Sequence, residues 1–70
     1  MTTEDKVREV LGRMTLLGES ETVVELDSLT VMDVVAKLEE ACGKSIPTSA
    51  IRLDAFASVT TIAKMLDSLE

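Results

Sequence analysis

The chain has 70 residues, a net charge of −6 at neutral pH, no histidine and one cysteine. A chain of this length builds only a small core, so we predict a single domain over residues 1–70. One cysteine cannot form an internal disulfide, and the missing histidines remove the commonest general base and a usual zinc ligand. We therefore expect neither an enzyme nor a resident metal. The acidic balance also argues against a nucleic acid partner, because phosphate binding requires a basic surface.

The first predicted helix begins at Thr2 or Thr3, either of which can cap the free N–H groups of a first turn. Apolar residues then recur at helical spacing, at Val7, Val10, Leu11 and Met14. We expect this helix to end near Leu17–Gly18. The polar start is unlike a signal peptide, and no stretch reaches the roughly 20 apolar residues of a membrane span. We therefore expect a cytoplasmic protein that does not bind a membrane.

The second predicted helix spans Ser28–Cys42 and follows a loop over residues 18–27. Within that loop Thr22–Val24 could form a short strand, although no partner strand is evident. Gly43 should stop the helix, because glycine readily adopts the left-handed conformation that ends helices. The expected core stripe follows spacings of three, three and four residues, at Met32, Val35, Leu38 and Cys42.

The last third of the chain is predicted to hold a short helical turn at Ser49–Leu53 and a final helix capped by Ser58. Ile46 should point inward, and Pro47 disfavours helix at that residue. The apolar stripe of the final helix comprises Val59, Ile62, Ala63, Leu66 and Leu69. Phe56, the only aromatic residue, should plug the core from the preceding loop. Together these elements predict an all-α fold, a four-helix bundle with three main helices and one short helix.

Familiar catalytic motifs are missing, since the sequence holds no P-loop, no GxGxxG and no EF-hand spacing. Cys42 has no candidate base and lies on the expected core face, so a buried apolar filler is favoured over a nucleophile. The remaining candidate is Asp27-Ser28-Leu29, at the predicted start of the second helix. It lies within residues 19–40, which hold seven acidic residues against one lysine, whereas the rest of the chain is neutral. This acidic segment is either solvated surface or a docking surface for basic partners.

The sequence around Ser28 resembles the carrier protein family, which comprises acyl carrier proteins of fatty acid and polyketide synthesis and peptidyl carriers of nonribosomal synthesis. The D-S-L hallmark is followed, at the offsets typical of the family, by Leu38-Glu39-Glu40, Gly43 and Ile46-Pro47. The resemblance is close over residues 26–47 and extends to the rest through the order of helices. It implies a covalent 4'-phosphopantetheine arm on Ser28, where the N–H groups of a helix start would favour a phosphodiester. The alternative is that Ser28 only caps the helix.

The resemblance also implies roles for the neighbours of Ser28. Asp27 matches the acidic residue that helps a phosphopantetheinyl transferase to position its metal. Five further residues match helix positions that face partner enzymes, namely Leu29, Asp33, Ala36, Glu39 and Glu40. The implied partners are the transferase, a ligase or acyltransferase that loads acyl or aminoacyl groups, and downstream synthases with basic docking surfaces. Without the resemblance, the acids would be read as solvated helix surface and Leu29 as packing.

Several positions differ from those of fatty acid carriers. Thr30 stands where an acid is common, Ala36 where a larger apolar residue is common, and Cys42 where an aromatic residue is common. The loop before Asp27 is short and lacks the usual Phe and Gly. We therefore expect a monomeric, stand-alone carrier that shuttles thioester-bound intermediates in a dedicated pathway, such as polyketide or nonribosomal peptide synthesis. The alternatives are a primary fatty acid carrier, an unmodified helical adaptor that binds proteins, and a small enzyme.

Overall fold

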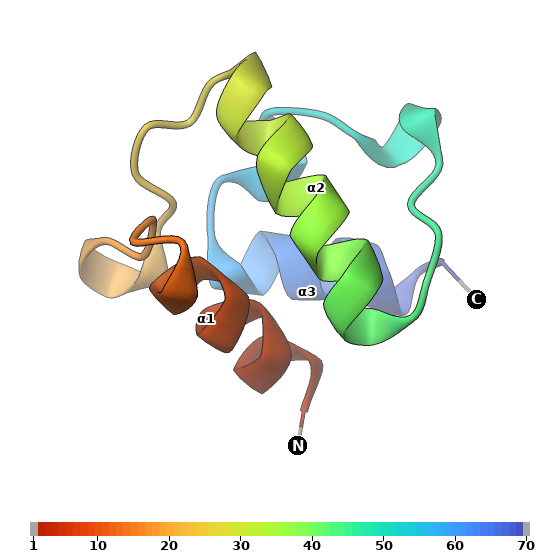
Figure 1. Cartoon of the computed structure of the whole chain (residues 1–70), viewed down its shortest axis with the longest axis horizontal. Coiled ribbons are helices and arrows are strands. Elements are labelled where there is room, and N and C mark those ends of the chain that lie inside the picture. The colour runs from red at the N-terminus through yellow and green to blue at the C-terminus, as the bar shows by residue number, and fades with distance from the viewer. Residues whose placement is uncertain (1, 70) are drawn as a thin grey trace.

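The computed structural model describes residues 2–69, in which three α-helices are joined by loops and short turns (Figure 1). The α-helices are α1 (Thr3–Arg13), α2 (Ser28–Cys42) and α3 (Val59–Asp67), and the 3₁₀ turns are η1 (Glu19–Glu21), η2 (Thr48–Ala50) and η3 (Asp54–Phe56). The predicted all-α class is confirmed, with η2 and η3 in place of the single short helix expected at Ser49–Leu53. Within the described residues, no helix combines the length and the apolar character that crossing a bilayer demands.

Helix α1 starts where the sequence predicts and ends earlier. Thr2 is the cap: its hydroxyl accepts a hydrogen bond from the Asp5 amide at 3.1 Å, and the Asp5 carboxylate accepts one from the Thr2 amide at 3.3 Å. The helix ends at Arg13 rather than near Leu17–Gly18. The reason is Thr15, which adopts a left-handed φ of 60° and turns the chain away from the helix axis.

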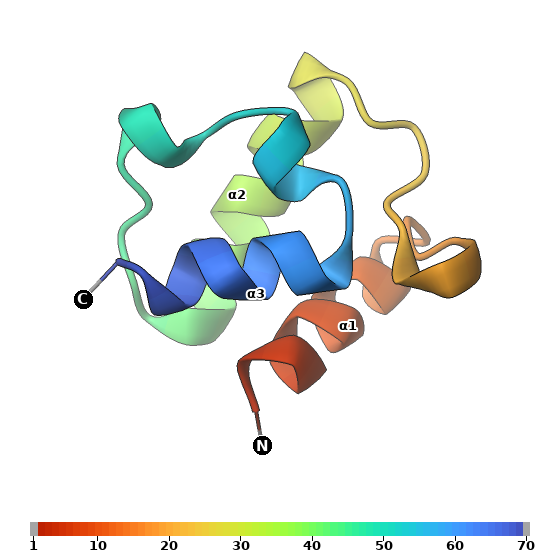
Figure 2. The same cartoon turned by 180° about the vertical axis from the view of Figure 1, so that it is seen from behind.

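The core lies where the three helices meet, with α1 packed against both α2 and α3. In the reverse view of Figure 2, α3 lies in front of α2, and α1 lies below them. Phe56 is 1% exposed and fills the centre, as predicted. Most of the other buried apolar residues come from the helices: Val7, Val10, Leu11, Val31, Val34, Val35, Leu38, Val59, Ile62, Ala63, Met65 and Leu66.

The buried stripe of α2 shares Val35 and Leu38 with the predicted one and otherwise differs from it. Met32 was expected in the core and is 56% exposed, whereas Val31 is 3% exposed. The buried set Val31, Val34, Val35 and Leu38 has the i, i+3, i+4, i+7 spacing of one helix face, and Met32 lies about 60° beyond the edge of that face. Cys42 is partly buried and packs against the core.

The loop between α1 and α2 is tied to α1 and to the start of α3. Arg8 of α1 pairs with Glu21 of the loop and with Asp5, at 2.8 Å for the latter. The expected strand at Thr22–Val24 is reduced to two isolated bridges within the described residues, which pair Leu17 with Val23 and Thr22 with Ser58. The loop therefore contacts the start of α3 on its way from α1 to α2.

Candidate functional site

Asp27 fixes the residue at which α2 begins. Its backbone is extended, its carboxylate accepts a hydrogen bond from the Thr30 amide at 2.8 Å, and its carbonyl accepts one from the Val31 amide at 2.9 Å. Asp27 is thus the helix cap, and Ser28 is the first helical residue. The alternative in which Ser28 itself caps the helix is wrong.

The side chain of Ser28 is left available by this arrangement. Ser28 is exposed and is the first residue of α2, the helix whose N-terminal end lies at the top of Figure 1. None of the hydrogen bonds among residues 2–69 uses its hydroxyl, because Asp27 supplies the capping oxygen. A hydroxyl at the exposed start of a 15-residue helix is open to a modifying enzyme, and the helix start favours an anion attached there.

The carboxylate of Asp27 carries its negative charge next to this hydroxyl. The hydrogen bond from the backbone amide of Thr30, with a smaller contribution from the Leu29 amide, holds the pKa of Asp27 below its ordinary value. Asp27 is therefore ionised throughout the neutral range. Asp27 is also exposed, so its carboxylate can accept further contacts from outside the protein.

The outer face of α2 carries four of the five residues expected to face partners. Leu29, Asp33, Ala36 and Glu40 are all exposed and follow spacings of four, three and four residues, which place them on one side of the helix. This side is opposite the buried stripe. Leu29 is 81% exposed, an unusual degree of exposure for a large apolar residue. We call these four residues the outer face of α2.

Glu39, the fifth of these residues, lies away from the outer face. Its carboxylate accepts a hydrogen bond at 2.7 Å from the backbone amide of Ile46, and its side chain is partly buried. Glu39 thus ties the loop that follows Gly43 back to α2. The sequence pattern contains both partners of this bond but does not show that they meet.

An apolar hollow of about 180 Å³ adjoins Ser28, which is one of its lining residues. Val31 and Met32 of α2 line it from one side, and Ile51 and Leu53 line it from the segment between η2 and η3. Met32 and Leu53 are 56% and 48% exposed, so the apolar lining reaches the surface. Sequence reasoning missed this hollow because helical periodicity does not show where the segment after Gly43 packs, and because Met32 was expected in the core.

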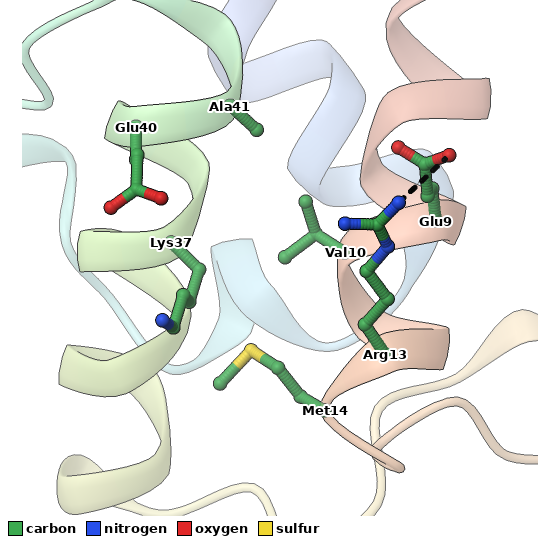
Figure 3. A pocket seen from close by; sticks show the side chains of 7 residues that line it. All are labelled: Glu9, Val10, Arg13, Met14, Lys37, Glu40 and Ala41. Atoms are coloured by element: carbon green, nitrogen blue, oxygen red, sulfur yellow. Dashed lines mark ion pairs between the residues drawn. The ribbon is translucent and has the colours of Figure 1, made fainter.

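A second groove, of about 500 Å³, lies between α1 and α2 (Figure 3). It is lined by Glu9, Val10, Arg13, Met14, Lys37, Glu40 and Ala41. Arg13 pairs with Glu9 at 3.9 Å along α1, while Lys37 and Glu40 face the groove from α2. Glu40 therefore borders both the outer face of α2 and this groove, whereas Ser28 lines only the smaller hollow.

Comparison with known proteins agrees with this geometry. A family model described as "Phosphopantetheine attachment site" matches residues 4–69. No curated protein and no solved structure matches the chain. Domains of the matched family bear a covalent 4'-phosphopantetheine on a serine, hold thioester-linked intermediates on it, and are generally not catalytic. They work with a phosphopantetheinyl transferase and with synthase partners. Because the match runs through nearly the whole chain, including the start of α2, this chain belongs to the phosphopantetheine attachment site family of carrier proteins.

Proposed function

We propose that Ser28 is the serine that carries the 4'-phosphopantetheine arm, and that the protein presents acyl or aminoacyl thioesters to enzymes of a dedicated biosynthetic pathway. The observation that carries the assignment is that capping of α2 and exposure of a free hydroxyl fall to two different residues. Asp27 takes the capping role, and the hydroxyl of Ser28 stays exposed and unused by the fold.

The surroundings of Ser28 fit the chemistry of the arm. A phosphodiester on the Ser28 oxygen would lie at the positive end of the α2 dipole, near the first backbone amides of the helix. The apolar hollow beside Ser28 offers a surface for the apolar part of the arm. When attached, the group supplies a terminal thiol that holds the cargo as a thioester.

Asp27 is the residue that we assign to the transferase reaction. Its exposed, ionised carboxylate could bind a metal ion held by the transferase, next to the hydroxyl that is modified. Over residues 2–69 no group of three or more acidic or cysteine side chains is arranged to hold a metal ion. We therefore assign the remaining ligands, and the base that activates Ser28, to the transferase.

The outer face of α2 is our candidate for partner docking. Asp33 and Glu40 supply negative charge at two points along the helix, and the exposed side chain of Leu29 supplies an apolar contact close to Ser28. A partner with basic residues around an apolar depression would complement this surface. We leave Glu39 out of this set because its carboxylate is committed to the Ile46 amide.

The assignment is tested by intact mass after incubation with coenzyme A, Mg²⁺ and a broad-specificity phosphopantetheinyl transferase. The wild type should gain the mass of one phosphopantetheine, and Ser28→Ala should gain none while its circular dichroism stays helical. Ser45→Ala, which removes another exposed serine, serves as the matched control and should be modified normally. Modification of Ser28→Ala would refute the assignment, and an unmodified wild type would favour the helical adaptor.

A further inference from the structure

The hollow beside Ser28 is an apolar feature on an acidic surface. Four large apolar side chains are exposed in the described part of the chain, and two of them, Met32 and Leu53, line this hollow. Its remaining apolar lining is Val31, which is 3% exposed, and Ile51, which is partly buried. These side chains place exposed apolar surface next to Ser28, and an apolar group attached there would gain free energy by covering it.

The occupant of the hollow can be inferred from its position. Because Ser28 is itself part of the lining, anything attached to its oxygen is tethered at the edge of the hollow and has a high effective concentration there. The first part of a phosphopantetheine arm beyond the phosphate is a carbon that bears two methyl groups. The parts that follow contain two amides, which lose hydrogen bonds to water if they enter an apolar site without partners.

The size of the hollow agrees with that chemistry. A hollow of about 180 Å³ has room for a branched group of a few carbons. It is too small for the whole arm with its cargo. The bulk of the arm must therefore remain outside.

We propose that the hollow formed by Val31, Met32, Ile51 and Leu53 seats the dimethyl-bearing segment of the arm. This inference rests on the proposed attachment at Ser28. With the first segment held against α2 and the segment between η2 and η3, the rest of the arm, with its thioester, lies outside the hollow. Holding the first segment restricts the orientations that the rest of the arm can adopt, while the cargo itself stays accessible to partner enzymes.

The test compares the apo and arm-bearing proteins by methyl NMR, with conversion first confirmed by intact mass. The methyl signals of Met32 and Leu53 should shift on conversion, and those of Val24, an exposed aliphatic residue outside the lining, should stay in place. If the mass does not change, the attachment proposal fails and this inference falls with it. If the mass increases while the Met32 and Leu53 signals stay in place, the seat alone is refuted.

A thermal experiment adds a second readout. The change in melting temperature on conversion should be lower by about 2–5 °C in Leu53→Ser than in the wild type, because the polar side chain removes part of the seat. In Val24→Ser the change on conversion should equal that of the wild type. Since each variant is compared with its own apo form, the effect of the phosphodiester charge cancels. Equal changes in all three proteins would overturn the proposal.

Discussion

The carboxylate of Glu39 accepts a hydrogen bond from the backbone amide of Ile46 at 2.7 Å. The bond closes the turn that begins at Gly43, whose φ of 66° ends α2 in the left-handed conformation. It also holds Ile46, which is 6% exposed, against the core. This contact gives a physical reason for the fixed spacing between the L-E-E and I-P segments, because the acid on α2 must meet an amide of the following loop.

We expect Glu39→Ala to destabilise the protein by about 1–2 kcal/mol, because the substitution leaves a partly buried amide without its charged partner. For a domain of this size that loss lowers the melting temperature by about 5–10 °C. Glu39→Gln should lose less, since the amide oxygen can still accept the bond. Glu40→Ala is the control, because Glu40 is exposed, and it should change stability by no more than about 0.5 kcal/mol. Equal losses in Glu39→Ala and Glu40→Ala would contradict a special role for the Ile46 bond.

The second prediction concerns electrostatic docking and uses residues that carry no such internal bond. Asp33→Lys combined with Glu40→Lys should lower the kcat/KM of the transferase for the protein by about tenfold, because both acids lie on the outer face of α2. Added salt should slow the wild type in the same direction, since charges separated by more than about 10 Å are screened at 0.1 M.

The control for this prediction separates local from global charge. Glu4→Lys combined with Glu9→Lys changes the net charge equally on exposed positions of α1. It should reduce the rate much less than the α2 pair. If both pairs slow the transferase alike, net charge rather than the outer face of α2 steers the encounter.

Two exposed glycines should respond to alanine in opposite directions. Gly12 lies within α1, and a Cβ added there would meet nothing within 4 Å. Gly12→Ala should therefore raise stability by about 0.5–1 kcal/mol through a better helix propensity. Gly43 also has open space around it but holds a left-handed φ, so Gly43→Ala should cost about 1–2 kcal/mol. Urea unfolding measures both, and a stabilised Gly43→Ala would show that the turn tolerates another conformation.

The limits of α2 could be predicted from the sequence because both of its ends are encoded locally. Asp27 is a strong capping residue and Gly43 a strong stop, so the helix begins and ends at the predicted residues. The end of α1 could not be predicted in the same way. Its break depends on Thr15, a residue with no preference for the left-handed conformation, which the contacts of the following loop must hold there.

The hollow and the Glu39 contact lay beyond sequence reasoning for a different reason. Each joins α2 to the segment that follows Gly43. Helical periodicity predicts which residues of α2 are buried, but it does not predict where that segment packs against the helix. The error at Met32 had a signal that could have prevented it. Val31, Val34, Val35 and Leu38 match one helix face more fully than a stripe through Met32 does.

The last prediction is that the protein does not shelter a long acyl chain. An internal chamber would be lined by Val35, Leu38, Cys42, Ile46 and Ile62. Cys42 is partly buried, the other four are each at most 6% exposed, and Phe56 belongs to the same core. Entry of a long chain would have to separate these packed groups, which loses their mutual contacts. Forms loaded with a two-carbon and with a twelve-carbon acyl group should therefore melt within about 2 °C of each other.

A variant that makes room in the core sharpens this measurement. Phe56→Leu removes part of the central ring at a cost of about 1–3 kcal/mol, which the fold should survive more readily than Phe56→Ala. In this variant the twelve-carbon group should raise the melting temperature above that of the two-carbon form, because a ligand that occupies only the folded state stabilises it. The contrary result would be that the twelve-carbon group raises the melting temperature of the wild type by many degrees over that of the two-carbon form. That result would mean the helices separate readily, and the protein would then be better explained as a primary fatty acid carrier.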